Sequence, residues 1–220
     1  MTALALRRTT WGHPELAAGG AAAAAWALLG VHALHPHSGT EPFLGALAGW
    51  VVMATAMMVP GALADVRRLA LSSMWQRRRR TIAFFLGGYL TVWTAFGALA
   101  LAALPLLGVS AGVLLAAATA WELTPWKWRA VRRCHLIEPL PPRGARADAA
   151  CARAGLGYGV RCVTSCWATM LAMAAAGHLA LGLMAFLTMV SAAEKLVVRS
   201  ARLRRPVAAA LAGAAVLALL

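Results

Sequence analysis

The sequence contains few acidic residues and none of the usual signatures of an enzyme. Only 7 of its 220 residues are Asp or Glu, and no two of them form the carboxylate pair that acid-base hydrolysis requires. There is no glycine-rich phosphate loop, and no grouping of serine, histidine and carboxylate that is typical of a hydrolase. The sequence therefore gives no positive evidence for catalysis.

Charged residues of either sign are also scarce. They make up 13% of the chain, whereas 61% is hydrophobic and the mean hydropathy is +0.71, values typical of a polytopic membrane protein. Most of the apolar segments reach the roughly 17 to 25 residues that cross a bilayer, and the fifth and the last are shorter. We therefore expect one all-helical integral membrane domain of six or seven spans over residues 1–220. The apolar segments are 16–34, 43–64, 82–104, 107–123, 162–177, 179–197 and 207–220.

The formal net charge is +14, and the 21 Lys and Arg residues follow an alternating pattern. They lie before the first segment, between the second and third, between the fourth and fifth, and from the end of the sixth onwards. The connections near residues 35–42, 105–110 and 177–179 contain none. The positive-inside rule then places the N-terminus in the cytoplasm and, if all seven segments cross, the C-terminus outside. Basic loops in this position orient the helices or contact anionic membrane lipids, so nucleic acid is not expected as a partner.

The same topology bears on the N-terminal segment and on the cysteines. The first apolar segment has about 19 residues, longer than the usual signal-peptide core of about 7 to 15, so an uncleaved helix is favoured over cleavage after Ala33.

The cysteines fall on or near the reducing cytoplasmic side, which argues against a disulfide framework. They are Cys134, Cys151, Cys162 and Cys166.

The longest connection, residues 124–161, is cytoplasmic in this topology. It begins with a threonine suited to a helix N-cap and a proline suited to the first helical position, which predicts a short interfacial helix over about 125–136. Trp126 and Trp128 are expected at headgroup depth. The remainder, up to Gly159, is rich in small and charged residues and is predicted to be flexible.

A row of sulfur atoms is the most informative pattern in the chain. Cys162, Cys166, Met170 and Met173 follow one another at steps of four, four and three, which places them on one face of a helix. Thiolate and thioether sulfur favour monovalent copper and related soft metals. Cysteine and methionine also pack well between helices, so the spacing alone leaves both a metal site and simple packing open.

Further candidate ligands lie on the first two segments. Met53 and Met57 share a helical face, Met58 follows, and Pro60 predicts a kink beside them. These thioethers suit a relay for a soft cation, or they fill the core. Gly45 and Gly49 on the same segment predict close helix packing.

Three histidines cluster at the outer end of the first segment, and imidazole binds zinc and copper. They either capture or release metal outside or act as polar caps. They are His32, His35 and His37.

Four stretches in the same order resemble a bacterial family of predicted metal-binding integral membrane proteins, over roughly residues 45–205. They are Trp50–Pro60, Leu123–Lys127 leading to Cys134, Gly159–Trp167, and the pair Glu194–Lys195. Members of that family include proteins similar to copper chaperones that are associated with copper oxidases such as tyrosinase and laccase.

The resemblance implies a multi-pass protein of the bacterial inner membrane that binds copper(I) and supplies a copper oxidase or another copper-binding partner. Carried over by position, it implies that Met53, Met57, Met58, Cys134, Cys162 and Cys166 hold the metal. The chain departs from the family at Ala130 and Ser165, where members often have further cysteines, so a mixed Cys/Met site is expected. The alternative is a membrane scaffold or assembly subunit that has no metal of its own.

Overall fold

The computed structural model describes residues 13–34, 42–134, 141, 144–176, 181–196 and 204–219, and within these ranges it contains helices and no strand. This confirms the predicted all-helical class. The α-helices are α2 (Leu16–Leu34), α3 (Phe43–Met58), α4 (Leu63–Ser72), α5 (Arg78–Leu107), α6 (Ala111–Leu123), α7 (Pro125–Cys134), α8 (Ala145–Ala176), α9 (Leu181–Leu196) and α10 (Arg204–Leu219). Two 3-10 turns, η1 (Pro60–Ala62) and η2 (Trp75–Arg77), precede α4 and α5.

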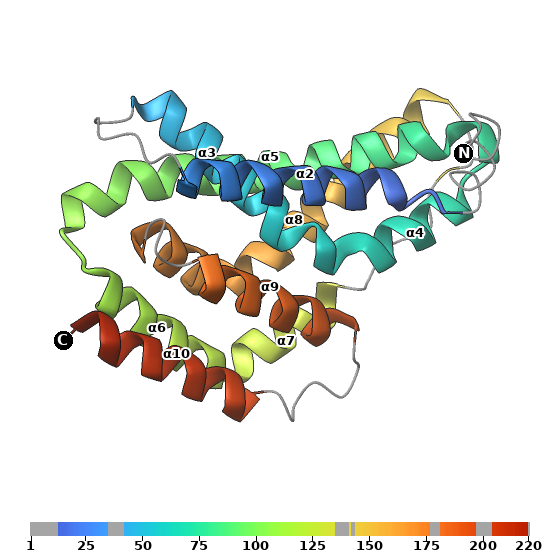
Figure 1. Cartoon of the computed structure of the whole chain (residues 1–220). Helices are drawn as coiled ribbons and strands as arrows, with labels where there is room; N and C mark the ends of the chain where they lie inside the picture. The colour runs from blue at the N-terminus through green and yellow to red at the C-terminus, as the bar shows by residue number, and fades with distance from the viewer. Residues whose placement is uncertain are drawn as a thin grey trace.

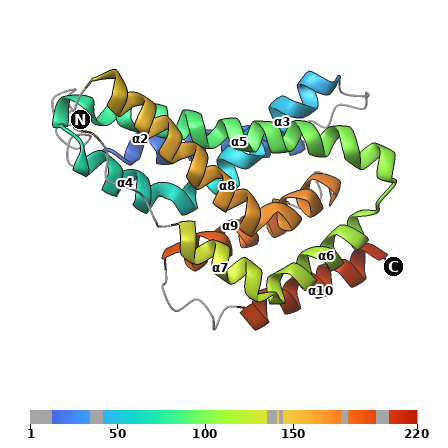
Figure 2. The same ribbon diagram turned by 180° about the vertical axis from the view of Figure 1, so that it is seen from behind.

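The helices form two groups that are joined by α8. Helices α2, α3, α4 and α5 lie together on one side, and α6, α7 and α10 lie on the other (Figure 1). Helix α8 packs along α5, then crosses the molecule to reach α6 and α7, as the reverse view also shows (Figure 2). Helix α9 occupies the middle and contacts α3 and η1. The face of α8 that carries the sulfur row therefore lies in the centre of the bundle.

Ion pairs gather the beginnings of several helices at one end of the bundle, here called the basic end. Arg67 on α4 lies 3.3 Å from Glu15, just before α2. At the same end Asp148, in the first turn of α8, accepts hydrogen bonds from both Arg77 and Arg80 beside the start of α5. This arrangement groups side chains that the charge pattern assigned to one face of the membrane.

By length and composition, two helices are able to cross a membrane among the described residues. They are Leu16–Leu34 and the continuous stretch Trp75–Leu107. A third span results if α3 and the stretch Pro60–Ser72 count as one, although their axes are bent by 45°. The structure thus supports two or three of the six or seven predicted spans.

The bend after α3 occurs where the sequence predicted a kink. Helix α3 ends at Met58, and Pro60 opens the 3-10 turn η1 before α4 begins at Leu63. Proline has no N–H to donate and its ring disturbs the preceding helical turn, which explains the break. The predicted kink is confirmed.

The connection over residues 124–161 is more helical than predicted. The Oγ1 atom of Thr124 accepts a hydrogen bond from the backbone N–H of Lys127 at 3.3 Å, which confirms the predicted N-cap of α7. Trp126 is exposed and Trp128 is buried, and the headgroup depth of both side chains stays a prediction. The prediction of a flexible stretch up to Gly159 is wrong, because α8 already begins at Ala145. Alanines with high helix propensity fill this stretch, and the ion pairs of its first turn anchor it.

Close packing between helices uses glycines other than those predicted. At Gly155 on α8 a side chain would overlap the backbone of Phe85, and at Gly88 on α5 it would overlap the backbone of α8. These two glycines let α5 and α8 approach each other closely. An added Cβ at Gly49 would meet nothing within 4 Å, and Gly45 and Gly49 line a cavity instead.

Candidate metal site

The sulfur row of α8 forms one buried face, as the spacing predicted. Cys162, Met170 and Met173 are fully buried, and Cys166 is 4% exposed. Cys162 and Cys166 are one helical turn apart on this face. We call these two residues the thiol pair.

Charged and polar side chains from two other helices reach Cys162. The Nζ atom of Lys195, on α9, donates a hydrogen bond to the Cys162 Sγ at 3.0 Å, although Lys195 is only 4% exposed. The Tyr89 hydroxyl, on α5, lies 3.2 Å from the same sulfur. The ammonium group also lies 5.9 Å from the centre of the Tyr158 ring, within the range of a cation–π contact.

The path of the Lys195 side chain depends on the break after α3. A Cβ added at Gly61, in η1, would lie 2.9 Å from the Lys195 Cδ, so any larger residue there would require the lysine stem to shift. The Tyr158 hydroxyl donates a hydrogen bond to the Gly61 carbonyl at 3.4 Å. The turn created by Pro60 thereby helps to hold the cation beside the thiol pair.

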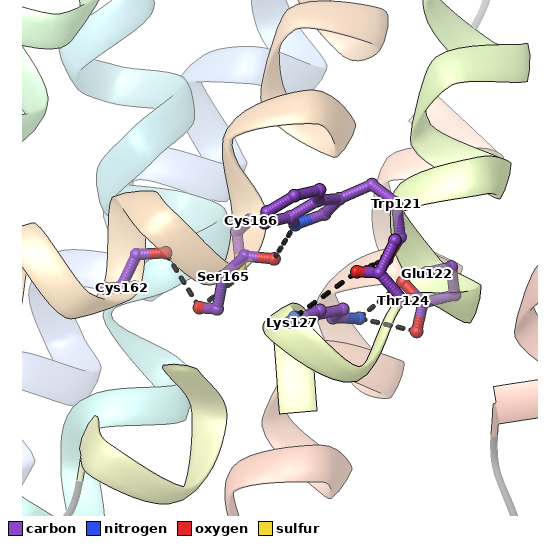
Figure 3. Close-up of polar contacts among 7 residues, drawn as sticks. All are labelled: Trp121, Glu122, Thr124, Lys127, Cys162, Ser165 and Cys166. Atoms are coloured by element: carbon purple, nitrogen blue, oxygen red, sulfur yellow. Dashed lines mark hydrogen bonds and ion pairs between the residues drawn. The ribbon is translucent and has the colours of Figure 1, made fainter. Parts of the chain in front are cut away.

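A polar network supports the other side of the thiol pair (Figure 3). Ser165 lies between the two cysteines, and its Oγ donates to the Cys162 carbonyl at 2.8 Å and lies 3.4 Å from the Cys166 Sγ. Its own carbonyl accepts a hydrogen bond from the Trp121 indole at 3.3 Å. Below the indole, Lys127 and Glu122 form an ion pair in which both side chains are buried.

The candidate methionines are buried, and some of them also line a cavity. Met57, Met58 and Met170 are packed in the hydrophobic core, as are Met53, Met173 and Met184. Met53 on α3 and Met173 on α8 line a cavity of about 650 Å³, together with Met184 on α9. This cavity lies between the ends of the helices that point away from the basic end.

The remaining predicted ligands are only partly described. His32, near the end of α2, is partly exposed and lines the same cavity. His35 and His37 lie outside the described residues. Cys134 is the last residue of α7, and its side chain also lies outside the described part of the chain.

The family of the chain follows from a comparison with known proteins. A family model described as PpoB2 copper chaperone matches residues 47–218. The chain belongs to the PpoB2 copper chaperone family. The match confirms the resemblance seen in the sequence and gives the chain a copper-related chaperone role. No curated protein and no solved structure matches it.

The donor set of this family member differs from that of a zinc site. Within the described ranges, no group of three or more His, Cys, Asp or Glu side chains could hold a metal ion. A structural zinc site uses four nitrogen or sulfur ligands in a tetrahedron. Two thiols with thioethers nearby are instead the soft ligands that suit monovalent copper.

Sequence reasoning missed several residues that surround the thiol pair. The sequence names Lys195 only as part of the pair Glu194–Lys195 that carries the family resemblance, and it predicts no contact with Cys162. A sequence pattern could have indicated that Lys195 faces the interior. Met184, Thr188, Ser191 and Lys195 recur at helical spacing, and in the structure all four are buried on one face of α9. Tyr89 carried no local signal, since nothing in its own segment marks it as a partner of Cys162.

Proposed function

We propose that this chain is an integral membrane chaperone that binds copper(I) at Cys162 and Cys166 and supplies it to a copper-dependent enzyme. The observation that carries the proposal is the contact between the buried thiol pair and the Lys195 ammonium group, 3.0 Å from Cys162. Family membership supports copper as the cargo.

The charge of such a complex explains why a lysine belongs beside it. One copper(I) ion between two thiolates carries a net charge of −1. An isolated charge is costly to bury in an apolar core, and a nearby opposite charge offsets that cost. Lys195 supplies one positive charge in contact with Cys162, so the loaded site would be neutral as a whole.

The rest of the chain supports a route across a membrane. Helices Leu16–Leu34 and Trp75–Leu107 have the length and composition of membrane spans. With the basic end in the cytoplasm of a bacterial cell, as the positive-inside rule predicts, the thiol pair lies inward of the methionine-lined cavity. In this proposal Cys134 collects the ion on the cytoplasmic side, and His32, His35 and His37 serve the outer side, where a copper oxidase or another copper-binding protein receives it.

Copper stoichiometry tests the proposal directly. The protein is purified in detergent under reducing conditions, loaded with copper(I), and compared with a Cys162→Ser/Cys166→Ser double variant. A Cys151→Ser variant is the matched control, because Cys151 is a buried thiol on the same helix, eleven residues before Cys162.

We expect the double variant to lose one equivalent of copper and the control to retain it. Equal copper in the wild type and the double variant would contradict the proposal and favour a scaffold without metal of its own. Delivery is then tested by adding the loaded protein to an apo copper oxidase and measuring the recovered activity against the same amount of free copper(I).

A further inference from the structure

The cavity at the end of the bundle opposite the basic end collects sulfur from three helices. It has a volume of about 650 Å³ and is lined by α2, α3, α5, α8 and α9. Met53, Met173 and Met184 each contribute a thioether, and His32 contributes an imidazole. Met53 and Met184 are 131 positions apart in the sequence, so the tertiary fold, and not local sequence, brings these thioethers together.

The lining restricts the kind of ion that the cavity can hold. Apart from His32, the residues that line it are apolar or glycine, and none is Asp, Glu, Lys or Arg. Without a carboxylate or thiolate, a divalent ion would keep its full charge in apolar surroundings, which is unfavourable. Neutral thioethers favour soft monovalent ions, and they form no charged complex beyond the ion itself.

The position of the cavity relates it to the thiol pair. Met173 follows Cys166 by seven residues on α8, a distance of about 10 Å along the helix axis. The buried Met170 lies between them on the same face. The cavity thus lies about two helical turns beyond the thiol pair along α8, in the direction away from the basic end.

We propose that Met53, Met173 and Met184 form a second site for a soft monovalent cation, separate from the thiol pair and weaker than it. This inference rests on the proposed function, because it assumes that copper(I) is the cargo. Met184 is an essential part of the site, and His32 lies at its edge. Three uncharged thioethers hold the ion without a balancing lysine, so the ion leaves this site more readily than it leaves the thiolates.

The test compares methionine variants in copper(I) binding. The full chain in detergent is titrated with copper(I) against a chromophoric copper(I) chelator, and a Met53→Leu/Met173→Leu/Met184→Leu variant is compared with the wild type. Leucine keeps the volume and hydrophobicity of methionine, so the fold tolerates the change. Met74→Leu/Met189→Leu is the control, since both of these methionines are exposed and neither is a candidate ligand.

We expect two copper(I) equivalents in the wild type and the control, and one, the tighter, in the cavity variant. The Cys162→Ser/Cys166→Ser variant should retain only the weaker equivalent, and the combined variant neither. A cavity variant that binds as much copper as the wild type, while the cysteine variant loses one equivalent, would overturn the second site alone. An unchanged cysteine variant would instead overturn the proposed function.

A second measurement keeps the test independent of the stability of the triple variant. The cysteine double variant is produced with selenomethionine, loaded with copper(I), and examined by X-ray absorption at the selenium edge. Copper neighbours of selenium are expected, and they should be lost with the single change Met184→Leu. No copper around selenium in the loaded protein would overturn the proposed site.

Discussion

Replacing Lys195 by leucine tests whether the buried ammonium group stabilises copper on the thiol pair. The substitution removes the charge, keeps an apolar side chain beside Gly61 and adds no thioether that could itself bind copper. With 3.0 Å between Nζ and Sγ, the Coulomb attraction of two full charges is at most about 5.5 kcal/mol at an effective dielectric constant of about 20. Desolvation and rearrangement reduce the net worth of such a charged hydrogen bond to about 1.5–3 kcal/mol.

This range corresponds to a roughly 10- to 100-fold weaker affinity for copper(I) in Lys195→Leu. Affinity is measured by competition with a chromophoric copper(I) chelator, and circular dichroism establishes that the helix content is unchanged. Arg132→Leu, which removes a positive charge from an exposed position on α7, is the control and should bind as the wild type does. Unchanged or tighter binding by Lys195→Leu would refute the reasoning, because repulsion between the ammonium group and the copper ion would then outweigh charge compensation.

Three further predictions concern stability and thiol reactivity. Lys127→Met removes the ammonium group that pairs with the buried Glu122 carboxylate, and should lower the free energy of unfolding by about 3–5 kcal/mol in detergent. Gly155→Ala forces a methyl group against the backbone of α5, and should cost about 1–3 kcal/mol. Burial raises the pKa of the Cys151 thiol, on the part of α8 before the predicted span, so its thiolate fraction near pH 8 is lower than that of a free cysteine and maleimide should modify it more slowly.

Each of these predictions has an outcome that would contradict it. The first fails if Lys127→Met unfolds at the same denaturant concentration as the wild type. For the second, Gly20→Ala is the matched control, since an added Cβ there meets nothing within 4 Å, and equal stability of the two alanine variants would show that α5 and α8 have room to separate. For the third, peptide-resolved mass spectrometry follows Cys151 against pH, and a rate equal to that of the denatured chain would contradict the effect of burial.

Local features of the fold could be predicted from the sequence. The first apolar segment, 16–34, coincides with α2, because an uninterrupted apolar run has no other regular structure available in a membrane. The break at Pro60 and the cap at Thr124 followed from the chemistry of single residues. In each case the cause and the structure lie within a few residues of one another.

Features that depend on distant parts of the chain could not be predicted in this way. The sequence predicts a flexible segment where α8 begins at Ala145, because small and charged residues are also typical of flexible segments. Its helix is fastened by Arg77 and Arg80, which lie about 70 residues earlier in the chain and pair with Asp148.

In the candidate site, too, the local pattern could be predicted from the sequence and the contacts between distant segments could not. Helical spacing placed Cys162, Cys166, Met170 and Met173 on one face, and the structure buries that face. The partners of that face come from elsewhere in the chain. Lys195 reaches Cys162 from α9, and Met184 joins the cavity from the same helix, so both depend on how α9 sits in the bundle.

The close approach of Gly61 to the Lys195 stem makes these two positions interdependent. A methyl group at residue 61 would press on the Lys195 Cδ, so Gly61→Ala should displace the ammonium group from Cys162 without changing any charged or sulfur-containing residue. Once Lys195 has been replaced by alanine, the same change at Gly61 meets no stem and should have little further effect. The effects of the two substitutions on copper affinity should therefore not add. A larger residue at position 61 would then lower the copper affinity only when a long side chain is present at position 195, on a different helix and 134 positions later.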